Sequence, residues 1–227
     1  MLLSIHVPKA AGNSFRESLM RTFGDRFLKD YGDWAGFDVP EAVERRKARE
    51  AEARAKRDEL LAKYDVIHGH FIADKYKGLF PVEQFVAFFR DPYQQAIAHY
   101  YFIKRNPQRE HPESRILHEA NMSLMDYLEW DAFRNHQSQF MGSLAIEDLA
   151  FVGLSDKYPL SMRLFKEILG YDLGEELFEN VNDNRTGEGY EVTPEARRSI
   201  EKYRAADIEL FRKATEIFER QQRRVLA

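Results

Sequence analysis

Short apolar runs alternate with amphipathic stretches along much of this chain. After the first run, apolar side chains recur at helical spacing from Ser14 onward, through Phe15, Leu19 and Phe23. Runs rich in β-branched and aromatic residues are typical of buried strands, and here they cover residues 2–7, 64–71, 84–89 and 151–154. This alternation predicts an α/β domain with three layers, in which helices flank a short, mainly parallel sheet.

The segments between and after these runs also carry secondary-structure signals. Residues 106–118 are polar and predict a loop, and residues 178–190 are rich in turn-forming residues and suggest a lid. Further helices are expected at residues 122–130, 133–141 and 158–169, and a last helix that Thr193 caps, with Pro194 at its first position. The apolar stripe of that last helix predicts core packing, with a homodimer interface as the alternative.

Residues 41–63 form a long stretch of alanine, arginine and glutamate with almost no apolar face. The pattern predicts a helix that faces solvent and is held by charge pairs, and so an insertion in the domain. The alternative is a basic arm that guides an anionic acceptor or touches a partner.

The first loop has the chemistry of an anion cradle. Pro8 ends the strand because it has no N–H for a ladder, and Lys9 and small residues lead into a helix N-terminus. Converging backbone N–H groups, the helix dipole and one lysine predict a site for a phosphate or sulfate ester. The lysine precedes Gly12, so the loop differs from the nucleoside-triphosphate pattern G-x-x-x-x-G-K-[ST]. An ordinary strand-turn-helix with a solvated lysine is the alternative.

Two further strand ends carry polar residues. The second strand ends in His68-Gly69-His70, and its two histidines share a face because side chains alternate along a strand. No further ligand is spaced to complete a metal site, so a base at the strand end is the better interpretation. Arg90 follows the third strand, and Asp91 is positioned to cap the next helix. We expect Arg90 on the same rim as Lys9, where it would bind an anion.

The composition of the chain argues against several classes of protein. The chain has 227 residues, 44% of them hydrophobic, which fits one folded domain over residues 1–227. A net charge of -4 argues against a nucleic-acid binder. Cysteine is absent from the sequence, which excludes disulfides and thiolate metal sites. We see no signal peptide and no apolar stretch of membrane-spanning length, so a cytoplasmic protein is expected.

Four segments in order, HVPKAAGNSF, HGHF, FFRDPYQQAIAHYYF and FVGLSDKYPLSMRLFKEILG, resemble the carbohydrate sulfotransferases that use 3′-phosphoadenosine 5′-phosphosulfate (PAPS). The chain is similar to the heparan sulfate 2-O-sulfotransferase branch and its soluble bacterial relatives, from residue 2 to about residue 170. The resemblance implies a P-loop-like fold and PAPS as co-substrate, without a metal. The acceptor it implies is a hydroxyl of a carbohydrate or glycolipid.

The resemblance also implies roles for individual residues. His70 matches the base that takes the acceptor proton, with His68 as the second candidate, and Arg90 matches the arginine that holds the 3′-phosphate. Lys9 matches the lysine that steadies the transferring sulfuryl group. The loop that holds the 5′-phosphosulfate corresponds to Lys9, Ala10, Ala11, Gly12, Asn13, Ser14 and Phe15.

The chain departs from the family at two positions of the helix after Arg90. Gln95 stands where the family has arginine, and Ala98 where it has serine. Each lost hydrogen bond to a charged phosphate costs about 1.5–3 kcal/mol. His99 is near but is expected to face another way, and Arg185 is our candidate to replace the lost contacts.

These observations favour a sulfotransferase. One alternative is a P-loop nucleotide or small-molecule kinase, which would need magnesium and a nucleoside triphosphate. The other is a non-catalytic nucleotide-binding relative, for which the residues at positions 95 and 98 are the best support.

Overall fold

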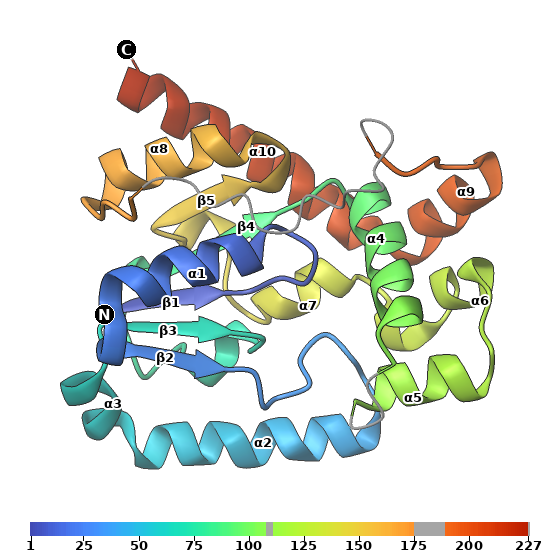
Figure 1. Cartoon of the computed structure of the whole chain (residues 1–227), viewed down its shortest axis with the longest axis horizontal. Coiled ribbons are helices and arrows are strands. Elements are labelled where there is room, and N and C mark those ends of the chain that lie inside the picture. Colours follow the sequence, from blue (N-terminus) through green and yellow to red (C-terminus); the bar gives the residue numbers. More distant parts are fainter. Residues whose placement is uncertain (108–110, 175–188, 227) are drawn as a thin grey trace.

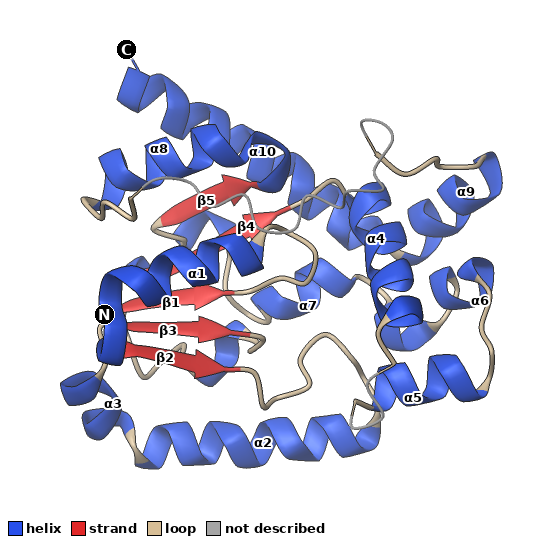
Figure 2. Ribbon diagram, viewed as in Figure 1, coloured by secondary structure: helices blue, strands red, loops and turns tan. Residues whose placement is uncertain are grey.

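Five short strands form one parallel sheet in the computed structural model, which describes residues 1–107, 111–174 and 189–226. The strands are β1 (Leu2–Ile5), β2 (Phe27–Asp30), β3 (Val66–Gly69), β4 (Phe85–Phe89) and β5 (Phe151–Leu154). Their order across the sheet is β2-β3-β1-β4-β5, and every pairing is parallel, as the arrows in Figure 2 show. The predicted three-layer α/β class is confirmed.

The sequence pattern predicts four strands and does not reveal β2. Its residues Phe27-Leu28-Lys29-Asp30 pair with β3 from Phe27 opposite Val66 to Asp30 opposite Gly69. As the edge strand it is half-exposed and carries a lysine, so it lacks the continuous apolar run that marks the buried strands.

Ten helices are described. Their bounds are α1 (Gly12–Phe23), α2 (Pro40–Ala55), α3 (Arg57–Lys63), α4 (Pro92–Arg105), α5 (Pro112–Glu119), α6 (Leu124–Leu128), α7 (His136–Met141), α8 (Tyr158–Leu169), α9 (Pro194–Tyr203) and α10 (Ala205–Leu226). The caps predicted from sequence are confirmed: the Asp91 side chain accepts from Gln94 N–H, and Thr193 Oγ1 accepts from Ala196 N–H. The predicted loop at residues 106–118 is wrong in its second half, where α5 begins at Pro112.

The core lies on both faces of the sheet. Helix α1 crosses the front of the sheet in Figure 1, and its Phe15 packs against Phe88 of β4 and Phe165 of α8. Helices α7 and α10 pack against each other, and α10 also packs on β5. There the Gln221 side chain bonds both the N–H and the C=O of Val152, at 3.1 and 2.7 Å, and so caps the free edge of the sheet.

A second apolar cluster lies away from the sheet, between α4, α5, α6 and α9. Its largest fully buried members include Tyr127 and Phe133. Within the described ranges, no helix has both the length and the apolar character that crossing a membrane requires.

The charged segment at residues 41–63 forms two helices, α2 and α3, which meet at Lys56. As predicted, it has little apolar face, since α2 buries only Ala42 and Ala53, and i,i+3 and i,i+4 ion pairs run along it. The segment is also anchored, which sequence did not show: the Arg49 guanidinium bonds the carboxylates of Asp30 and Asp33 at 2.9 and 3.1 Å.

A buried charge network sits at this anchor. The Lys75 ammonium donates to Asp30 at 2.6 Å and to Asp33 at 2.8 Å, and Tyr76 O–H donates to Asp30 at 2.8 Å. The side chains of the lysine and both aspartates are at most 5% exposed. In Figure 1, α2 runs along the β2 edge of the sheet, where this network holds it.

The last predicted helix is two helices, α9 and α10, divided at Arg204. A residue distant in sequence causes the break, because Asn135 N–H donates to Tyr203 C=O and the Asn135 side chain accepts from Ala206 N–H. The apolar stripe packs on the core as predicted, and Ile200 and Phe218 are fully buried.

Candidate functional site

The strand order creates a crevice between β1 and β4. The chain leaving β1 runs to β2 on one side of the sheet, and the chain leaving β4 leads to β5 on the other side. Ligands of open α/β sheets bind at such a switch point, outside the carboxyl ends of the strands. Lys9 lies in the loop after β1 and Arg90 directly follows β4, so both residues lie at this point (Figure 1).

A cavity of about 680 Å³ opens at the crevice. The predicted site residues that line it are Lys9, Ala11, Gly12, Asn13, Ser14, His70 and Arg90. Ala10 and Phe15 are buried in the core, each 1% exposed, and do not line the cavity. Arg185 lies outside the described residues.

The loop before α1 holds a constrained backbone. Lys9 and Ala11 both have positive φ, at 63° and 66°, a conformation that costs non-glycine residues energy. Ala11 is the N-cap of α1 and offers no side-chain hydrogen bond, so the first N–H groups of the helix are not capped from within. A Cβ on Gly12 would lie 1.8 Å from the His6 ring, which explains the glycine. The loop therefore presents a helix N-terminus to the cavity.

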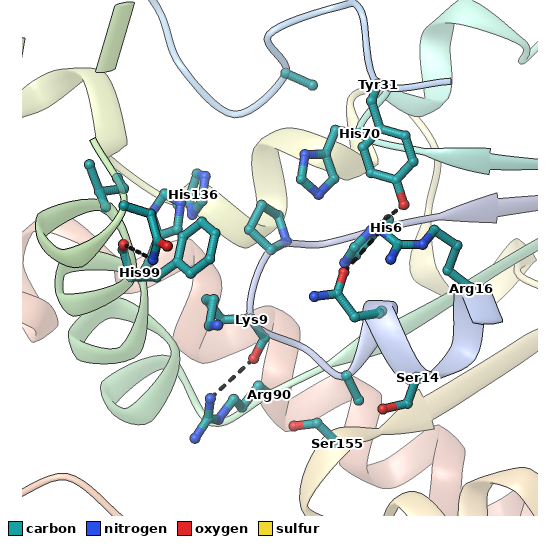
Figure 3. A pocket seen from close by; sticks show the side chains of 18 of the residues that line it. His6, Lys9, Ser14, Arg16, Tyr31, His70, Arg90, His99, His136 and Ser155 are labelled. Carbon is teal, nitrogen blue, oxygen red and sulfur yellow. Dashed lines mark hydrogen bonds between the residues drawn. The ribbon is translucent and has the colours of Figure 1, made fainter. Parts of the chain in front are cut away.

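Two cations meet at this loop. Arg90 donates from Nη1 to the Lys9 carbonyl oxygen at 3.2 Å, and the Lys9 ammonium lies 4.5 Å from the centre of the Phe102 ring. Figure 3 shows Lys9 and Arg90 beside each other at the end of the cavity near Ser14 and Ser155. Burial lowers the pKa of Lys9, and the positive charges of Arg90 and Arg105 lower it further. A bound anion would relieve this repulsion.

Gln95 has a structural role beside the cavity. Its Nε2 group donates to the Pro8 carbonyl oxygen at 3.0 Å and lies 3.1 Å from Nδ1 of His136. The carbonyl oxygen can only accept, so it fixes the orientation of the amide, whose second N–H then points at the imidazole. Gln95 thus anchors the cradle loop, and neither it nor the buried Ala98 lines the cavity.

His70 projects into the other part of the cavity. Its ring lies 4.4 Å from that of His6 and 4.7 Å from that of Tyr31, and its buried Nε2 finds no hydrogen-bond partner in the described parts of the chain. Burial lowers the pKa of His70 to about 3, with smaller contributions from His111 and Arg16. The imidazole is therefore neutral at physiological pH and able to accept a proton or a hydrogen bond.

His68, the second candidate base, is 1% exposed and does not line the cavity. Its Nδ1 lies 2.8 Å from Ser4 Oγ, on the face of the sheet that Phe15 covers. This arrangement is that of a core histidine with a polar partner.

Several lining residues were not singled out from sequence. His6 directly follows β1, and its Nδ1 lies 2.8 Å from Tyr31 O–H. His99 lines the cavity, although we expected it to face another way, and its ring stacks on that of His136 at 4.5 Å. His6 meets the same strand-end criterion as His70, and His99 shares a helix face with Gln95 four residues before it. Those two signals were present in the sequence.

Comparison with protein-family models, with curated proteins and with solved structures finds no match to this chain. In the described residues no group of three or more histidine, aspartate and glutamate side chains is arranged to hold a metal. Any function is therefore argued from the site itself.

Proposed function

We propose that this protein is a sulfotransferase that moves a sulfuryl group from PAPS to a hydroxyl of a carbohydrate or glycolipid acceptor. The observation that carries the proposal is the meeting of Lys9, Arg90 and His70 around one cavity at the switch point of the sheet. The donor is an anion at both ends, and two cations from neighbouring strand ends match that requirement.

The residues present fit this chemistry. The acceptor oxygen attacks sulfur, the bond from sulfur to the bridging oxygen breaks, and the electron pair leaves with 3′,5′-ADP. Charge spreads over the moving group, so positioning and fixed positive charge carry the catalysis. Lys9 and the N–H groups of the α1 N-terminus are placed to stabilise that charge.

His70 would accept the proton that the acceptor hydroxyl loses. Burial keeps this imidazole neutral, which is the form that a base requires. A bound anion raises the pKa of a neighbouring histidine, because opposite charge favours the protonated form. Donor binding would thus make His70 a stronger base at the moment of transfer.

The substitutions at positions 95 and 98 leave Arg90 as the predicted 3′-phosphate ligand among the described residues. Arg185 stays our candidate for a second one. If Arg185→Ala leaves the affinity for 3′,5′-ADP unchanged, that assignment is wrong. A cytoplasmic location and a homodimer stay predictions.

Calorimetric titration with 3′,5′-ADP, 5′-AMP and ATP with magnesium tests the proposal. We expect 3′,5′-ADP to bind tightest, and Arg90→Ala or Lys9→Ala to weaken it about 10- to 150-fold, the equivalent of one charged hydrogen bond. Arg223→Ala is the matched control, because Arg223 is exposed on α10 and does not line the cavity. Preference for ATP with magnesium would instead indicate a kinase.

A measurement of turnover distinguishes an enzyme from a non-catalytic nucleotide-binding relative. Release of 3′,5′-ADP from PAPS in the presence of hydroxyl acceptors should fall at least about 100-fold in His70→Asn, the size of a general-base contribution. Nucleotide affinity should change little in this variant. Binding of 3′,5′-ADP without any transfer would favour the non-catalytic relative.

A further inference from the structure

The cavity has a second region whose chemistry differs from that of the anion cradle. Among the described lining residues, the lysine and arginines are Lys9, Arg16 and Arg90. Arg90 bonds the Lys9 carbonyl, so these two cations lie together at the loop after β1, whereas Arg16 of α1 lies beside Tyr31 and contributes to the lowered pKa of His70. The remaining lining mixes aromatic and aliphatic side chains, among them Ala35, Phe37, Ile103 and Phe133, with polar ones, among them His70, His99, Asn106 and His136.

Glu113 is the acidic residue of this second region. It lies in the first turn of α5, directly after Pro112, and lines the cavity with a side chain 20% exposed. Its Oε2 is buried and accepts no hydrogen bond in the described parts of the chain. Its Oε1 lies 3.6 Å from His111 Nδ1, longer than a hydrogen bond.

Leaving a buried carboxylate oxygen without a hydrogen-bond donor costs free energy. The helix dipole favours a negative charge in the first turn of a helix, which accounts for a carboxylate at this position. The dipole supplies no hydrogen bond to Oε2, so the desolvation cost of that oxygen persists until a donor arrives. The cavity is where such a donor can enter.

Glu113 and His70 line the same cavity. His111, two residues before Glu113, lines it too and contributes to the lowered pKa of His70. A molecule that places a hydroxyl near His70 therefore has the start of α5 and its carboxylate within reach.

We propose that Glu113 selects the acceptor: it recognises a hydroxyl compound that carries an amine or another hydrogen-bond donor and an apolar face, and it repels polyanions. The inference rests on the proposed sulfotransferase function and deepens it. A sulfated or uronic-acid polymer would bring negative charge to the region of this unpaired carboxylate.

Three matched probes test the inference: phenyl β-D-glucosaminide, phenyl β-D-glucoside and phenyl β-D-glucuronide, which share ring and phenyl group and differ in charge. Binding is measured by calorimetry with 3′,5′-ADP saturating. We expect the glucosaminide to bind about tenfold tighter than the glucoside, and the glucuronide to bind weakest, as one charged hydrogen bond implies. Glu113→Gln should remove the preference for the amine, and Glu113→Lys should favour the glucuronide.

Glu119→Gln is the matched control, because Glu119 is exposed on the same helix and does not line the cavity. The inference is overturned if the glucuronide binds as tightly as the glucosaminide, if the preference survives in Glu113→Gln, or if none of the probes binds. The affinity of Glu113→Gln for 3′,5′-ADP should equal that of the wild type. Failure of 3′,5′-ADP to bind the wild type would instead refute the proposed function.

Discussion

Acid should unfold this protein over a narrow pH range because five histidines are buried in it. Burial is the first cause that lowers the pKa of His6, His68, His70, His99 and His136, and for His70 and His136 the value falls to about 3. In the unfolded chain these side chains have their ordinary pKa of about 6.5. Below that pH the unfolded state binds protons that the folded state does not bind, so the free energy of unfolding decreases as the pH falls.

The size of the effect follows from this difference. Between pH 7 and pH 5, a histidine whose pKa is about 3 in the folded state costs about 2 kcal/mol of folding free energy. His70 and His136 together therefore cost about 4 kcal/mol, a large part of the total stability of an ordinary domain at about 5–15 kcal/mol, and His6, His68 and His99 add to the loss in the same direction. Burial raises the pKa of Asp33 and Asp207, and these two carboxyls offset part of the loss because the folded state protonates them first.

Urea unfolding at half-unit steps from pH 8 to pH 5 measures this dependence. We expect little change above pH 7 and a steep decrease below pH 6.5, with about two or more protons taken up on unfolding near pH 5.5. His99→Gln should lower that uptake by about one proton, whatever it does to the stability at pH 7. A slope equivalent to one proton or fewer between pH 6 and pH 5 would refute the reasoning.

Three substitutions test other contacts. Gln95→Leu removes the donor to the Pro8 carbonyl and should destabilise the fold by about 1–3 kcal/mol in urea and weaken 3′,5′-ADP binding; unchanged binding would show that the anchor is dispensable. Lys75→Met leaves two buried carboxylates without their lysine and should cost about 3–5 kcal/mol in the same assay, whereas a loss below about 1 kcal/mol would contradict the network. Gln221→Leu exposes the β5 edge, and light scattering should detect more association than in the wild type.

The positions of most strands and helices depend on the residues of each segment itself, so the sequence was sufficient to predict them. Apolar runs marked four of the five strands, and Asp91 and Thr193 marked two helix starts through caps that the structure contains. The prediction failed where a neighbour distant in sequence decides the outcome. Strand β2 has only two apolar residues and pairs with β3, and Asn135 divides the last helix at Arg204.

At the candidate site, too, sequence predicted what depends on neighbouring residues and missed what depends on distant ones. Sequence selected Lys9, Arg90 and His70 from their places after strands, because such strand ends meet at one edge of a parallel sheet. It did not select Glu113, whose unpaired oxygen is visible only once α5 is folded beside the cavity. It also did not reveal the role of Gln95, which bonds a loop carbonyl 87 positions away in the chain.

The amino-acid sequence by itself therefore determined the alternation of strands and helices, the small-residue loop and the polar residues at the strand ends. Only the tertiary structure decided which of those ends are neighbours, which side chains share the cavity and how far burial shifts the pKa values of the histidines. The physical reason is that periodicity and capping act over a few residues, whereas burial, charge repulsion and cavity shape depend on groups brought together from the whole chain.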